Sequence, residues 1–154
     1  MIFFISCGGK QKADPGTYFD KASEYNSYIT VRFDEVNRLW NACLSVMDDS
    51  TLIYKQLDTL RETSRQSMLD MNNLADFKGD TGYKHAAGEY FRYMLSICDG
   101  SYKKAIDIGL EDDLPDSLYV QYMAISNQIG ADKDTCINHL KTAQLRFVEL
   151  TNKE

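Results

Sequence analysis

Apolar side chains recur at alternating steps of three and four residues along most of the chain, and this period constrains the fold more than any other feature. Such steps place residues on one face of an α-helix. No alternation with period two competes with them, so the sequence predicts an all-α fold. Four apolar stripes can be traced, with Asn26 as the one polar member of the first: Phe19, Ala22, Asn26, Ile29, Phe33, Val36, Trp40, Cys43 and Met47; Ile53, Leu57, Leu60, Ser64, Ser67, Met71 and Leu74; Tyr83, Ala87, Tyr90, Met94, Ile97, Ser101, Ala105 and Ile108; and Leu118, Tyr122, Ile125 and Ile129, continued by Cys136, Leu140, Ala143, Phe147 and Leu150.

The segments between the stripes predict where the helices begin and end. Thr17 is a candidate N-cap for the first helix, and residues 48–50 (Asp-Asp-Ser) end that helix and cap the next. Residues 77–82 contain two glycines and form the clearest turn, while residues 109–116 separate the third and fourth stripes. Short turns make neighbouring helices antiparallel, so residues 17–151 are predicted to form a single up-down-up-down four-helix bundle domain.

The last stripe is interrupted by Gly130-Ala131-Asp132, so we expect a kink or break near Gly130. An alternative concerns the C-terminal half alone. Residues 100–106 (Gly-Ser-Tyr-Lys-Lys-Ala-Ile) resemble the turn and second-helix start of a tetratricopeptide repeat, with a weaker echo after Gly130. This resemblance covers at most residues 84–150, and its glycines are 30 residues apart instead of the repeat's ~34. It implies two short helical hairpins, a helix break near Gly100 and a protein–protein adaptor.

The chain opens on an apolar run that ends in Ile5-Ser6-Cys7. This resembles the lipobox of bacterial lipoproteins, in which the cysteine thiol is diacylated and the preceding peptide is removed. The lipobox and the helical body together resemble small helical bacterial lipoproteins of unknown function. The resemblance implies that residues 1–6 are a signal-peptide remnant, that Cys7 is the lipidation site and that residues 7–16 form a flexible tether. A signal peptide has a basic start and ~7–15 apolar residues, so we expect the true start to lie upstream of Met1.

The same resemblance implies a location in the cell. A lipid anchor at Cys7 would make the membrane a partner and would place the protein on the outer membrane of the bacterial cell envelope. Residues 8–12 (Gly-Gly-Lys-Gln-Lys) lack the acidic side chains that often accompany surface export in such proteins, which favours a periplasm-facing position. The alternative is a cytoplasmic protein in which Cys7 is accidental. A net charge of -6 and the lack of a basic stripe argue against nucleic acid as a partner, while a protein partner stays open.

The sequence contains few residues in patterns typical of catalytic, cofactor or metal sites. The chain lacks Glu-x-x-His, Cys-x-x-Cys-His, Gly-x-Ser-x-Gly, His-Glu-x-x-His and a glycine-rich phosphate loop. Cys43 and Cys136 lie on apolar stripes with no adjacent histidine, and with Cys98 they are predicted to be buried free thiols. The sequence therefore predicts no catalytic, cofactor or metal site, and it favours a non-catalytic binding or structural module.

The alternative function class is a cofactor- or metal-carrying bundle. The only two histidines are His85 and His139, and His85 stands one helical turn before Glu89. His139, or the pair His85–Glu89, would then supply ligands.

Acidic residues cluster at two of the predicted connections. With alternating helix directions, both connections lie at one end of the bundle, opposite the tether. This acidic end is either a solvated cap or a docking site for a basic partner. Its members are Asp48, Asp49, Glu111, Asp112, Asp113 and Asp116.

Overall fold

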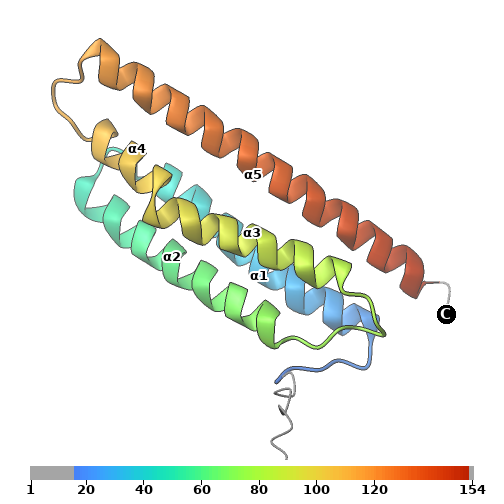
Figure 1. Ribbon diagram of the computed structural model, residues 1–154. Helices are drawn as coiled ribbons and strands as arrows, with labels where there is room; N and C mark the ends of the chain where they lie inside the picture. Colours follow the sequence, from blue (N-terminus) through green and yellow to red (C-terminus); the bar gives the residue numbers. More distant parts are fainter. Residues whose placement is uncertain (1–15, 153–154) are drawn as a thin grey trace, which may run out of the picture.

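The computed structural model describes residues 16–152, which form an antiparallel bundle of α-helices without a β-strand (Figure 1). The helices are α1 (Ala22–Leu44), α2 (Ser50–Asn73), α3 (Gly82–Asp99), α4 (Ser101–Gly109) and α5 (Asp116–Thr151). In Figure 1, α4 continues the course of α3, so the two together occupy the position of the third helix of the bundle. The predicted all-α, up-down-up-down four-helix bundle is confirmed.

Two of the predicted turns have the expected chemistry. The carboxylate of Asp49 caps α2, because it accepts hydrogen bonds from the backbone N–H groups of Thr51 (3.0 Å) and Leu52 (2.9 Å). In the turn before α3, Lys78 and Gly79 have φ of 48° and 85°, a region that glycine enters without strain. Both turns reverse the chain sharply and make the neighbouring helices antiparallel.

Thr17 does not cap the first helix, so that prediction was wrong. Its backbone N–H donates to the carbonyl of Asn73 (3.2 Å), and its carbonyl accepts from the N–H of Ala75 (2.9 Å). The chain therefore enters the bundle as an extended segment paired with the end of α2, and α1 begins only at Ala22. Thr17 fixes the entry point of the chain beside the α2–α3 connection.

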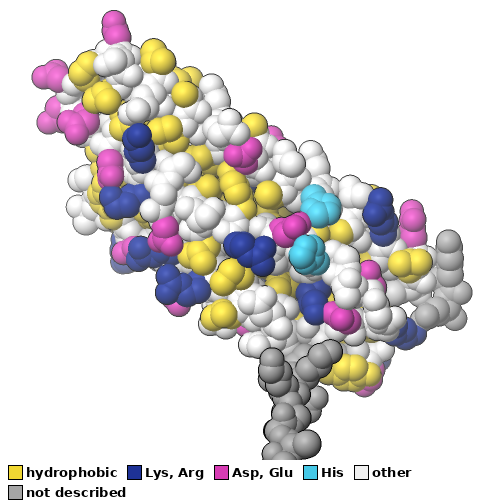
Figure 2. Space-filling view, viewed as in Figure 1, with side chains coloured by type: hydrophobic (Ala, Val, Ile, Leu, Met, Phe, Trp, Pro, Cys, Tyr) yellow, Lys and Arg dark blue, Asp and Glu magenta, His cyan; other side chains and the backbone are white. Residues whose placement is uncertain are grey.

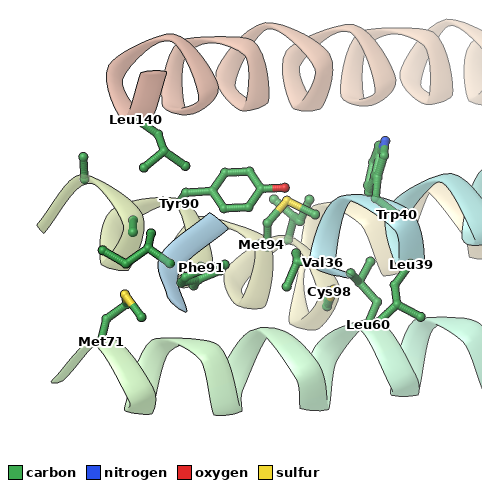
Figure 3. Packing of buried hydrophobic residues seen from close by; sticks show 14 of the residues in the cluster. Val36, Leu39, Trp40, Leu60, Met71, Tyr90, Phe91, Met94, Cys98 and Leu140 are labelled. Atoms are coloured by element: carbon green, nitrogen blue, oxygen red, sulfur yellow. The ribbon is translucent and has the colours of Figure 1, made fainter. Parts of the chain in front are cut away.

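The apolar stripes form the core of the bundle. All seven residues of the second stripe are buried, including Ser64 and Ser67. These small side chains, with Gly88 on the facing α3, let the two helices approach closely. Figure 3 shows the result from nearby, with Val36, Leu60 and Leu140 converging from three different helices on the residues of α3.

The chain breaks at Gly100 and not at Gly130, which corrects the predicted position of the kink. A Cβ at Gly100 would lie 3.2 Å from the carbonyl oxygen of Ser96, and helix α3 ends there. Helix α5 passes through Gly130 unbroken, and a Cβ at Gly130 would meet nothing within 4 Å. An interior glycine costs a helix only about 1 kcal/mol. Burial of Ile129 and Leu140 on either side outweighs that cost.

The tetratricopeptide-like layout of the C-terminal half is not adopted. The break near Gly100 that it implied is present, but the chain does not reverse there (Figure 1). Its second hairpin would have to fall within residues 116–151, which form one continuous helix. The C-terminal half therefore forms the third and fourth helical segments of the bundle, α3 with α4, and α5.

The two ends of the bundle differ in character. The α1–α2 turn and the α4–α5 loop lie at one end, whereas Thr17 and the α2–α3 turn lie at the other (Figure 1). The predicted acidic end is thus opposite the point where the chain enters the bundle. The predicted lipidation site Cys7 and residues 1–15 lie outside the described residues. Within residues 16–152, no helix is both long enough and apolar enough to cross a membrane.

Candidate functional site: the α3–α5 groove

The structure brings both histidines of the chain to one carboxylate. His85 Nε2 lies 3.2 Å from Glu89 Oε1, and His139 Nδ1 lies 3.0 Å from Glu89 Oε2. Residues 85 and 89 share a face of α3 because they are one helical turn apart, whereas His139 arrives from α5. In Figure 2 the two histidines, in cyan, stand together on one face of the molecule. We call these three residues the histidine–glutamate cluster.

This cluster links α3 to α5, but it lies at the surface. The side chains of His85, Glu89 and His139 are 68%, 39% and 58% exposed, so water and salt weaken their attraction. Each imidazole nitrogen faces a different oxygen of the carboxylate. Among residues 16–152, no group of three or more histidine, cysteine or acidic side chains is arranged to hold a metal ion. The candidate ligands from the sequence are thus brought together within ion-pair distance of one carboxylate.

Beside the cluster, a groove runs between α3 and α5. It consists of two hollows of about 480 and 500 Å³ that share Tyr93 and Ser96. The hydroxyl of Tyr93 donates to the carbonyl of Ile129 (3.0 Å) and ties the two helices together between the hollows. Burial, together with the nearby charge of Asp132, raises the pKa of Tyr93 to about 12, so this hydroxyl keeps its proton at neutral pH.

The two hollows have different linings. The first lies beside the break at Gly100, and its apolar lining includes Ile97 and Ile125. The second is lined by Glu89, Arg92, Tyr93, Ser96, Thr135, Cys136 and His139. An apolar stretch with polar groups at one end suits the binding of an amphipathic group.

The three cysteines of the described chain are free and lack the surroundings of a nucleophile. Burial raises the pKa of Cys43 to about 11 and that of Cys98 to about 12. Cys136 lines the groove and is partly exposed, but burial and the negative charges of Glu89 and Asp132 raise its pKa as well. A thiol attacks as its thiolate, so a raised pKa lowers the reactivity of all three at neutral pH. The prediction of buried thiols is confirmed for Cys43 and Cys98, while Cys136 is only partly buried.

Sequence reasoning found the histidines but missed the groove. His85 and Glu89 were predicted as a pair from their spacing, and His139 was named separately. The sequence alone does not show that His85 and His139, which are 54 positions apart, lie close together, because this depends on how each helix is rotated about its own axis. The one local signal that could have indicated the groove is Tyr93, which stands one position before Met94 of the third stripe. No family model matches the chain, and neither a curated protein nor a solved structure matches it.

Proposed function

We propose that this chain is a non-catalytic binding module of the bacterial cell envelope, carried by a lipid anchor at Cys7 on the outer membrane and facing the periplasm. One observation carries the proposal: the chain enters the bundle at Thr17, at the end opposite the α4–α5 loop (Figure 1). An anchor attached there holds the acidic end away from the membrane. Helix α5 has 36 residues and is therefore about 54 Å long, which sets the reach of that end.

The chemistry of the described side chains supports binding over catalysis. The thiols of Cys43, Cys98 and Cys136 are held protonated by burial. The imidazoles of the histidine–glutamate cluster pair with Glu89, and neither is hydrogen-bonded to a hydroxyl or thiol of the described residues. The α3–α5 groove and the exposed acidic end remain as surfaces that a partner could contact.

The first experiment is the intact mass of the native protein isolated from the membrane fraction of its host. The proposal expects a chain that begins at Cys7 and carries added acyl mass, whereas the Cys7→Ser variant should be found unacylated in the soluble fraction. An unmodified chain that retains residues 1–6 refutes the anchor. Cross-linking in intact cells then tests the binding role, because a partner module should give a defined heterologous adduct.

The meeting of the two histidines favours a second candidate function, a metal-carrying bundle. In this case His85, Glu89 and His139 would have to turn from their present side-chain contacts before they could share one ion. The exposure of these side chains leaves them free to turn. Metal analysis of protein from its own host decides between the candidates: a stoichiometric transition metal that is lost in His139→Ala supports the second, and metal-free protein refutes it.

A further inference from the structure

The start of α5 has the composition of a buried helix. Residues 118–125 read Leu-Tyr-Val-Gln-Tyr-Met-Ala-Ile, and Gln121 is the one residue among the eight that is not apolar or aromatic. A helix that is apolar all round is normally covered on every side. This segment therefore needs more covering than a single neighbouring helix provides.

The bundle covers only one side of this segment. Its inner side packs on α4, where the ring of Tyr122 lies 3.4 Å from the position of an added Cβ at Gly109. Even so, none of the residues of α5 from Asp116 to Gln128 is buried. On the outer side, Tyr119, Val120 and Met123 are 51%, 66% and 38% exposed. Met123 neighbours both of the others on the helix surface, since it lies four positions after Tyr119 and three after Val120.

Acidic side chains stand directly before this apolar surface in the sequence. Four exposed acidic residues precede or begin the helix: Glu111, Asp112, Asp113 and Asp116. None of the four forms an ion pair with another residue of the described range 16–152. The sequence contains no lysine, arginine or histidine from residue 105 to residue 132. Figure 2 shows acidic and hydrophobic side chains gathered at this end of the molecule.

We propose that this surface, Tyr119, Val120 and Met123 with the four acidic residues, docks a cationic amphipathic helix of another protein. The apolar face of such a helix covers the three exposed side chains, and its lysines or arginines meet the unpaired carboxylates. The inference rests on the proposed binding function and names the partner's chemistry.

Charge decides against the other occupants of this surface. A second copy of the chain would bring another four acidic residues to the same contact, which repels at short range. An anionic membrane surface repels the patch in the same way, and the patch lies at the end opposite Thr17.

The test uses the full chain and a probe of defined chemistry. The probe is a fluorescein-labelled 14-residue peptide of leucine and lysine with the leucines at helical spacing, and its control replaces every lysine with glutamate. Fluorescence anisotropy measures binding to the wild type and to the double variant Val120→Ser, Met123→Ser. The matched control is Leu145→Ser, because Leu145 lies on the same helix and is 65% exposed. Circular dichroism establishes that each variant keeps its helix content.

We expect saturable binding of the lysine peptide and roughly tenfold weaker binding to the double variant, with Leu145→Ser unchanged. Neutralising two carboxylates in Asp112→Asn, Asp113→Asn should weaken binding and flatten its dependence on salt. Equal binding of the glutamate peptide, or equal loss in Leu145→Ser, overturns the proposal. It is also overturned if the double variant abolishes a wild-type dimer in sedimentation, or binding to phosphatidylglycerol vesicles, and leaves peptide binding intact.

The result is separable from the proposed function. If an acyl group is found at Cys7 and cross-linking yields a partner, but the patch variants bind the probe like the wild type, the envelope module stands and this docking surface is refuted. If the chain proves unacylated, the docking surface is still tested by the same peptide measurements.

Discussion

Tyr90 allows a direct test of how an unpaired buried hydroxyl affects the stability of this bundle. The side chain is completely buried, and its ring packs against Phe33 at a centroid distance of 5.0 Å and against Phe91 at 5.6 Å. Its hydroxyl has no hydrogen-bond partner in the described chain. Figure 3 shows this hydroxyl pointing along the gap between α3 and α5, near Met94. Burial raises the pKa of Tyr90, so the group is neutral at all moderate pH values.

Tyr90→Phe should therefore stabilise the protein. An unpaired buried hydroxyl costs about 1–3 kcal/mol. Removing one oxygen leaves a hole of roughly 15 Å³, which at about 24 cal/mol per Å³ costs about 0.4 kcal/mol. The ring contacts are kept, so we expect a net gain of about 1 kcal/mol in the free energy of unfolding.

Tyr83 on the same helix is the matched control. It is equally buried, but its hydroxyl lies 3.3 Å from Thr30 Oγ1 and shares a hydrogen bond with it. Tyr83→Phe should cost about 0.5–1.5 kcal/mol, because it removes that bond. Urea unfolding followed by circular dichroism at 222 nm measures both variants, provided that the slopes with urea agree. If Tyr90→Phe is destabilised as much as Tyr83→Phe, the hydroxyl of Tyr90 is satisfied in solution and the reasoning is refuted.

Three further predictions follow from single positions. Gly130→Ala should raise the free energy of unfolding by up to about 1 kcal/mol, since the new Cβ meets open space on an exposed part of the helix. Gly100→Ala should lower the free energy of unfolding, because its Cβ would lie 3.2 Å from the carbonyl oxygen four residues earlier. Thermal unfolding measures both variants. Ellman's reagent should modify Cys136 before Cys43 and Cys98 in the folded Cys7→Ser protein, and simultaneous modification would contradict their burial. Burial raises the pKa of Cys43 to about 11 and that of Cys98 to about 12, above their unfolded values near 9. The stability that these thiols contribute is therefore complete below about pH 9 and declines between pH 9 and 12. Urea midpoints measured at pH 7 to 11 should fall only above pH 9.

The sequence by itself determined the secondary structure and the buried face of most helices. The second stripe is the clearest case, because all seven of its residues are buried, from Ile53 to Leu74. The cap at Asp49 was equally predictable. Both depend on local rules: the 3.6-residue period decides which side chains share a face, and a short carboxylate side chain satisfies the free N–H groups at a helix start.

Other features were decided only when the helices packed. Gly130 looked like a break and Gly100 is one, because a glycine's effect depends on the burial of its neighbours and not on the glycine alone. The meeting of His139 with Glu89 depends on how α3 and α5 are rotated toward each other, which no local pattern encodes. The exposed face at the start of α5 is the reverse case. The sequence of residues 118–125 is that of a covered helix, but the short α4 shields only one side, so the surface left open is a property of the tertiary structure.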